Sequence, residues 1–142
     1  MIGPGTKLRK AKMERSAMAG HLIRRLQQQS TQVFQTRMHA AGFDLTSVQF
    51  AALDAIAQLP GIDQATLSAT IGFDRATIGG VIERLESKGL ILRGISEVDR
   101  RARILHLTSH GSDLLSECRP IVETLQLEIL GSLTREERRV FT

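Results

Sequence analysis

The chain contains little cysteine and no long apolar run. One cysteine, Cys118, in 142 residues excludes a disulfide within the chain and a zinc site built from several cysteines. No stretch approaches the roughly 18 consecutive apolar residues of a membrane-spanning helix, and the N-terminus lacks the apolar segment of a secretory signal. We therefore expect a cytoplasmic protein with no membrane partner.

The motifs of common enzyme classes are also missing. The sequence has no Gly-rich phosphate loop, no nucleophile elbow, no pair of carboxylates in an apolar setting and no multi-ligand metal motif. We therefore expect a protein that is not an enzyme and binds neither a metal nor a cofactor. Apolar residues make up 42% of the chain, which is ordinary for a single globular domain of this length.

The charges are segregated along the chain, which carries 19 basic and 15 acidic side chains. Residues 1–25 hold seven basic side chains and one acidic, residues 38–74 hold four aspartates and no Lys or Arg, and residues 75–103 hold seven basic and four acidic. Two separated basic regions indicate a polyanionic partner, and nucleic acid is the commonest such partner.

The first part of the chain predicts two helices. Apolar residues recur at helical spacing from about Gly20 to Ala41, where Gly42 is a suitable helix stop. A second helix starts after Thr46, a good N-cap, and ends at Pro60-Gly61. Residues 1–12 are basic with too little apolar content to pack, so we expect a mobile arm there.

Two short helices joined by a tight turn follow. Asp63 is a candidate N-cap for the first, and Asp74 is one for the second. Only Gly72-Phe73-Asp74 separates the two, which is the sequence form of a helix-turn-helix. The expected inward residues are Leu67 and Ile71 in the first helix and Ile78, Val81, Ile82 and Leu85 in the second.

A hairpin is predicted next. Residues 90–95 and 102–108 are rich in Ile and Leu and resemble strands, and the polar residues 96–101 between them fit a hairpin tip. A helix-turn-helix followed by a hairpin is the pattern of a winged helix.

The last part of the chain predicts a long helix. It starts near the cap Ser109 and carries a wide apolar stripe to Leu133, and Pro120 predicts a bend near Glu117. Thr134, followed three residues later by a glutamate, is the pattern of a capping box that starts another helix.

These elements predict a mostly α fold with a minor β part. After an arm over residues 1–15, residues 16–142 form one domain, with a winged helix-turn-helix over about 46–108. The flanking helices, about 17–41 and 109–142, are more apolar than a domain of this size needs. We therefore expect long N- and C-terminal dimerisation helices and a homodimer.

The order and spacing of several motifs resemble the multiple-antibiotic-resistance regulator (MarR) family of dimeric winged-helix transcription factors, from about Gly20 to the end. The residues that carry the resemblance are Arg84-Leu85-Glu86-Ser87-Lys88-Gly89-Leu90-Ile91, Arg93, Asp99-Arg100-Arg101, Leu107-Thr108 and Gly111. It implies a cytoplasmic regulator of transcription, usually a repressor, that binds a pseudo-palindromic operator in double-stranded DNA.

The helix that follows Asp74 is the candidate recognition helix. With its apolar positions facing the core, Arg75 and Thr77 are the candidates for reading base edges in the major groove, and Arg84 also faces outward. Gly79 and Gly80 cost helix stability, so we expect a reason for them, either close approach to DNA or packing against the preceding helix. Thr66 and Ser68 are candidate phosphate donors.

At the hairpin tip, Asp99-Arg100-Arg101 resembles the wing signature of the family. The resemblance implies that Asp99 positions Arg101 and that Arg101 enters the minor groove, where a narrow A/T-rich groove attracts arginine. Arg100 and Arg103 are expected to meet phosphates, and Arg93 lies at the base of the wing.

The family binds small phenolic or aromatic carboxylate ligands between the dimerisation helices and the winged helix. An arginine beside an apolar cleft suits a flat carboxylate, so we expect an aromatic effector to release the protein from DNA. The candidate ligand-binding residues are His21, Arg24, Arg25, Gln28, His39 and Phe50.

Three other interpretations remain open. A redox sensor would use Cys118, and a metal sensor would use His106 and His110, which are four residues apart. An architectural DNA-binding protein would use the basic arm and the glycines of the recognition helix for contacts that do not depend on sequence.

Overall fold

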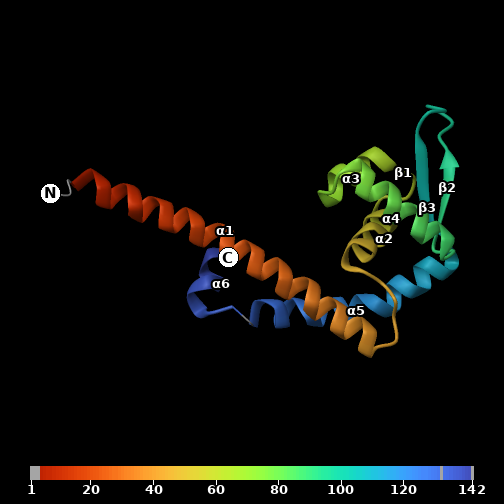
Figure 1. Ribbon diagram of the computed structural model, residues 1–142. Helices are drawn as coiled ribbons and strands as arrows, with labels where there is room; N and C mark the ends of the chain where they lie inside the picture. Colours follow the sequence, from red (N-terminus) through yellow and green to blue (C-terminus); the bar gives the residue numbers. More distant parts are fainter. Residues whose placement is uncertain (1–3, 132, 142) are drawn as a thin grey trace.

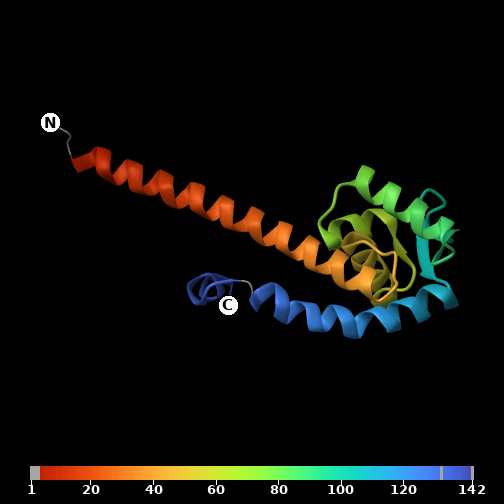
Figure 2. The same ribbon diagram turned by 60° about the horizontal axis from the view of Figure 1, so that its bottom comes forward.

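The protein folds into a winged helix-turn-helix domain from which two long helices extend side by side (Figures 1 and 2). A computed structural model describes residues 4–131 and 133–141, in which no helix is long and apolar enough to span a membrane. The elements are α1 (Pro4–Ala40), α2 (Ser47–Gln58), β1 (Ile62–Asp63), α3 (Gln64–Ile71), α4 (Arg75–Ser87), β2 (Ile91–Ile95), β3 (Arg103–Leu107), α5 (Ser109–Gly131) and α6 (Arg135–Phe141). The expected fold class, mostly helical with a small sheet, is confirmed.

Helix α1 begins much earlier than the sequence predicted. Residues 4–15, which were expected as an arm, form its first turns, and residues 1–3 of that arm lie outside the described part. The segment contains Lys, Arg, Met and Ala, which are good helix formers, and proline is tolerated in the first helical turn. The helix ends as predicted, with Gly42 at φ +82°.

The core lies where α2, α3 and α4 pack on the sheet. Its largest fully buried side chains include Leu53 of α2, Leu67 of α3, Ile82 of α4 and Leu105 of β3, each less than 2% exposed. Burial of this apolar surface fixes the position of the helix-turn-helix relative to the strands.

The sheet has three antiparallel strands in the order β1-β3-β2. Strands β2 and β3 form the predicted hairpin, in which Ile91 pairs with Leu107 and Ile95 pairs with Arg103. Strand β1 was not predicted, because two residues are too few for a recognisable alternation. It joins the start of α3 to the hairpin, since Ile62 pairs with Leu105.

Helix α5 starts at Ser109, but its cap is Thr108 rather than Ser109. The Gly111 N–H donates to Thr108 Oγ1 at 3.0 Å, and the same hydroxyl donates to the Gly89 carbonyl at 2.6 Å. The helix continues through Pro120 and is bowed rather than broken (Figure 2).

The C-terminal segment forms two helices, as the sequence predicted, because α5 ends at Gly131 and α6 begins at Arg135. The predicted capping box at the start of α6 is confirmed. The Thr134 N–H donates to Glu137 Oε2 at 2.9 Å, and the Glu137 N–H donates to Thr134 Oγ1 at 3.2 Å. The short helix lies near the middle of α1, since Glu137 of α6 lines a small pocket together with Leu22 and Leu26 of α1.

Candidate nucleic-acid interface

Two aspartates fix the geometry of the helix-turn-helix. Asp63 accepts hydrogen bonds from the Thr66 N–H at 2.7 Å and from Thr66 Oγ1 at 2.9 Å, and Asp74 accepts the same pair from Thr77 at 2.7 and 3.0 Å. These bonds cap α3 and α4, as predicted, and lower the pKa of both carboxyl groups. Between the helices, Gly72 has φ +75°, a left-handed conformation that favours glycine.

Helix α4 turns one face to the core and leaves another in solvent. Its buried residues are those predicted, Ile78, Val81, Ile82 and Leu85. Recognition helices contact base edges mainly with their N-terminal residues, so the exposed face is the candidate reading surface. That face consists of Arg75, Ala76, Thr77, Gly80, Glu83 and Arg84, with Gly79 half-buried at its edge.

Packing within the protein does not require Gly79 or Gly80. A Cβ added at Gly80 would meet no atom within 4 Å, and one at Gly79 would meet Gln64 Nε2 at 3.6 Å, an ordinary contact. Each glycine nevertheless costs a helix about 1 kcal/mol relative to alanine. Packing against the preceding helix therefore does not explain either glycine, and their close approach to DNA stays a prediction.

The hydroxyl groups expected to contact DNA are engaged within the protein, those of Thr66 and Ser68 expected at phosphate and that of Thr77 expected at base edges. Ser68 is buried, and its Oγ donates to the Phe73 carbonyl across the turn, so Ser68 is not available as a surface donor. The reason is that the tight turn brings the Phe73 carbonyl over α3. Thr66 and Thr77 are exposed, but their hydroxyl protons are donated to Asp63 and Asp74.

The wing tip is ordered by its own hydrogen bonds. Ser96 Oγ accepts from the N–H groups of Val98 and Asp99, and Asp99 Oδ1 accepts from the Arg101 N–H at 3.0 Å. Asp99 therefore orients the backbone of Arg101, in line with the role that the family resemblance implies. Arg100 and Arg101 are exposed on this tip.

Arg93 occupies a different position from the other wing arginines. Its guanidinium forms two hydrogen bonds with Glu86 of α4, from Nε to Oε2 at 3.0 Å and from Nη2 to Oε1 at 3.1 Å. This pairing lowers the pKa of Glu86 and raises that of Arg93. The ion pair joins the base of the wing to α4, and the expected DNA contact of Arg93 stays a prediction.

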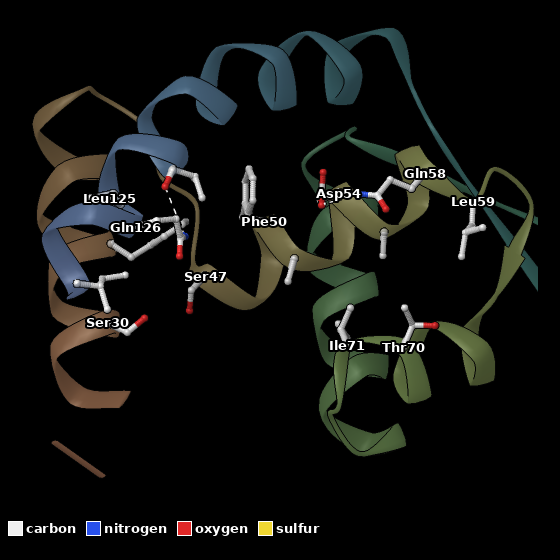
Figure 3. A pocket seen from close by; sticks show the side chains of 15 residues that line it. Ser30, Ser47, Phe50, Asp54, Gln58, Leu59, Thr70, Ile71, Leu125 and Gln126 are labelled. Atoms are coloured by element: carbon white, nitrogen blue, oxygen red, sulfur yellow. Dashed lines mark hydrogen bonds between the residues drawn. The ribbon is translucent and has the colours of Figure 1, made fainter. Parts of the chain in front are cut away.

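A cleft of about 390 Å³ separates the long helices from the winged helix-turn-helix (Figure 3). Its walls come from α1, α2, α3 and α5, and they include Phe34 and Phe50, whose ring centroids lie 6.1 Å apart. Serine, threonine and glutamine side chains supply hydrogen-bonding groups. Asp54 also lines the cleft and pairs with Arg119 of α5 at 2.7 Å.

Of the six residues expected to bind an effector, the structure places only Phe50 in this cleft. Helix α1 extends beyond the domain, so only its later turns, from Ser30 onward, face α2 and line the cleft. Sequence periodicity gives the faces of a helix but not the turn at which another helix crosses it. The other five residues are exposed along α1: His21, Arg24, Arg25, Gln28 and His39.

The residues of the redox and metal interpretations lie in ordinary surroundings. Cys118 is buried in α5, and burial together with Glu117 raises the pKa of its thiol, which disfavours the reactive thiolate. His106 is exposed on β3 and His110 on α5. Across residues 4–131 and 133–141, no three potential metal ligands come together.

The sequence matches the profile of the MarR family over residues 45–102, from the start of α2 to the end of the wing tip. The transcriptional regulator HosA from Escherichia coli O157:H7 is 36% identical over 123 residues, which cover 87% of this chain and 88% of HosA. The chain belongs to the MarR family. Like HosA, this MarR-family protein is a transcriptional regulator, so the resemblance drawn from the motifs is confirmed.

Two solved structures of similar regulators bear on ligands and DNA. BpsR from Bordetella bronchiseptica, described as regulated in its DNA binding by 6-hydroxynicotinic acid, has a TM-score of 0.76 and 31% identity, with 86% of each chain covered. The transcriptional repressor CouR, bound to a 23-mer DNA duplex, has a TM-score of 0.74 and 29% identity, with 89% of this chain and 87% of CouR covered.

Proposed function

We propose that this MarR-family protein is a homodimeric repressor that binds a pseudo-palindromic operator and is released by a small aromatic ligand, a phenol or a carboxylate. The observation that carries the DNA-binding part is the concentration, around the exposed face of α4 and the wing, of arginines that form no ion pair with any described residue. The similarity to CouR, a repressor bound to duplex DNA, supports the same conclusion.

Exposed apolar side chains on the long helices support a homodimer. Ile23 of α1 is 61% exposed, and Leu127 of α5 is 75% exposed. Met18 and Leu130 are exposed on the same two helices. A second copy of the chain would bury these residues, and a two-fold axis would then set the recognition helices about one helical turn of DNA apart, near 34 Å.

On DNA, α4 lies in the major groove and the wing reaches the adjacent minor groove. Thr77, Gly79 and Gly80 face the base edges, and Arg84 lies farther along the same helix. Arg101 enters the minor groove from the wing, and Arg100 beside it meets phosphate.

The effector occupies the cleft between α1, α2, α3 and α5. Its aromatic walls suit a flat ring, and the control of BpsR by 6-hydroxynicotinic acid supports an aromatic acid. No Lys or Arg of the described residues lines the cleft, so a carboxylate needs a cation from elsewhere. Exposed Arg24 and Arg25 on α1 of the second subunit would supply it.

Ligand binding shifts the population of dimers away from the form that fits DNA. A ligand does this only if it binds the other form more tightly, because a ligand with equal affinity for both moves no equilibrium. The cleft is suited to such a preference, since it lies between the helices expected to hold the dimer and the domain expected to hold DNA.

The test is binding to a duplex selected from a random-sequence pool by the full chain. Fluorescence anisotropy would compare this duplex with a scrambled one at fixed salt, with and without a panel of phenols and aromatic carboxylates. We expect tight binding to the selected duplex and release by one class of compound. Equal, weak binding to both duplexes would instead indicate an architectural protein.

Two variants locate the effector. Phe50→Ala removes an aromatic wall of the cleft and should abolish release while leaving DNA binding intact. Phe43→Ala is the matched control, because Phe43 is half-buried between α1 and α2 and does not line the cleft. Arg24→Ala should weaken release by carboxylates more than release by phenols, and equal release by both would remove Arg24 from the site.

A further inference from the structure

A second cleft, of about 280 Å³, lies between the recognition helix, the wing and the start of α3. Arg75 forms its wall on α4, and Arg101 and Arg103 form its wall on the wing. The first residues of α3, Gln64 and Ala65, complete it. Two elements that are separate in sequence, α4 and the wing, thus bring three arginines to one depression.

These three arginines are unpaired. None of their guanidinium groups has a hydrogen bond or ion pair with any residue in the described ranges, whereas Arg93 and Arg119 are each paired with a carboxylate. The carboxylate that lines the cleft is Asp63, and both of its oxygens accept hydrogen bonds from Thr66. Three cationic side chains and one carboxylate therefore line the cleft, and the carboxylate already accepts hydrogen bonds from Thr66.

Gathered cations repel one another, and a bound anion would offset this repulsion. The size and charge of the cleft suit a phosphate.

The position of the cleft identifies which phosphate. A sugar-phosphate strand separates the major groove from the adjacent minor groove. With α4 in one groove and the wing in the other, that strand must cross the surface between them, where the cleft lies. A phosphate of this strand is therefore the anion within reach of both walls.

We infer that Arg75 and Arg103 bind one backbone phosphate from the two sides of this cleft, with Arg101 beside them on the wing. This inference rests on the proposed DNA binding and gives Arg75 a different role from the base reading that its helix position predicted. Such a site couples the wing to the recognition helix through the DNA, because neither element can shift without losing the shared phosphate.

The test uses the selected duplex with single phosphates replaced by uncharged methylphosphonate. For the native protein, one position in each half-site should lower affinity about tenfold, the scale of one charge-assisted contact. Arg75→Ala and Arg103→Ala should each cause a similar loss on the unmodified duplex and no further loss on that modified duplex. Arg100→Ala is the control, because Arg100 lies outside the cleft. This variant should still lose affinity when methylphosphonate replaces that phosphate.

Salt dependence gives a second measurement. A lost phosphate contact reduces the slope of log K against log[KCl] by about 0.9 and weakens binding to all sequences alike. We expect both variants to show this on selected and on scrambled duplex. A changed preference at one base pair in Arg75→Ala, or sensitivity of the two variants to different phosphates, would overturn the shared site.

The two proposals can fail separately. If the native protein does not prefer the selected duplex, the proposed sequence-specific repressor is contradicted. The salt slopes of Arg75→Ala and Arg103→Ala on scrambled duplex would still test whether the cleft binds a phosphate. Reduced slopes would support the phosphate site, and unchanged slopes would contradict it.

Discussion

Arg93 of β2 and Glu86 of α4 form a bidentate ion pair that joins the wing to the recognition helix. The pair is partly exposed, with side-chain exposures of 31% and 40%. Surface ion pairs contribute little to stability, so its value lies in orientation rather than in folding. It holds the base of the hairpin against α4, the candidate recognition helix.

We predict that Arg93→Ala weakens binding to the selected duplex and leaves the salt slope unchanged. The positive charge of Arg93 is already balanced by Glu86. Its loss should therefore not reduce the number of counterions that leave the DNA when the protein binds. Anisotropy titrations over a series of KCl concentrations would measure both quantities. A slope reduced as much as in Arg103→Ala would show that Arg93 contacts phosphate after all.

We predict that Gly80→Ala has opposite effects on folding and on DNA binding. The added Cβ has open space in the protein, so the variant should gain up to about 1 kcal/mol in free energy of unfolding. The same Cβ should weaken binding to the selected duplex, because it stands on the reading face of α4. Urea unfolding and anisotropy would measure the two effects.

Gly20→Ala is the matched control for this prediction. Gly20 is also helical and exposed, with nothing within 4 Å of an added Cβ, but it lies on α1. It should gain stability and keep its DNA affinity. Unaltered DNA binding in Gly80→Ala would mean that the backbone of α4 does not approach the groove closely.

We predict that Leu127→Asp separates the dimer into monomers. Leu127 is 75% exposed on α5, and an aspartate there would have to be buried without a partner in the proposed interface. Light scattering after gel filtration would give the mass, and anisotropy should show a loss of DNA binding. Leu92→Asp changes a residue of similar exposure on the wing and should stay dimeric.

The local structure could be predicted from the sequence because it depends on neighbouring residues. Thr46, Asp63 and Asp74 cap the helices that their positions predicted, and Gly72 closes the turn. A cap is decided by a side chain and an N–H group three residues away. The recognition helix and its buried face followed from the same local rules.

The site residues were less predictable because their roles depend on contacts between distant segments. Arg93 and Arg103 are both wing arginines in the sequence, yet of the two only Arg93 forms an ion pair, with Glu86 of α4. The sequence predicted Ser68 as a surface donor to phosphate. In the structure Ser68 is buried, and its hydroxyl donates to the Phe73 carbonyl. The cleft proposed to bind the effector depends on where α5 and α2 cross α1, which periodicity does not encode.

We predict that the helix caps make the protein sensitive to acid. Hydrogen bonds from Thr77 lower the pKa of Asp74 below its ordinary value of 3.8, and those from Thr66 do the same for Asp63. A carboxyl group with a lowered pKa in the folded state stabilises the fold above the unfolded pKa. That stabilisation is lost as the pH falls through the folded pKa.

Asp74→Asn tests this prediction, because asparagine caps a helix about as well as aspartate but does not ionise. Its free energy of unfolding should fall less than that of the native protein between about pH 6 and pH 3. Urea unfolding at fixed protein concentration would measure the difference. Asp113→Asn, an exposed aspartate on α5 that caps no helix, should follow the native protein, and identical curves for all three would contradict the prediction.

We predict that Gly111→Ala is strongly destabilising, although alanine is the better helix former. Gly111 is buried in the first turn of α5, and an added Cβ would lie 2.0 Å from the Leu90 carbonyl oxygen and 2.9 Å from its carbon. These are backbone atoms at the start of the wing, and the same oxygen accepts the Thr108 N–H at 3.0 Å. Relief of the clash therefore requires α5 to move away from the hairpin.

Overpacking of this kind costs about 1–3 kcal/mol, and we expect the free energy of unfolding to fall by at least that amount in urea titrations. DNA affinity should fall as well, because α5 joins the wing to the expected dimer interface. Gly20→Ala, which adds the same methyl group in open space, should be more stable than the native protein. A Gly111→Ala variant as stable as that control would show that α5 and the wing adjust to each other freely, and the rigid link between the DNA-binding and dimerisation parts would then be wrong.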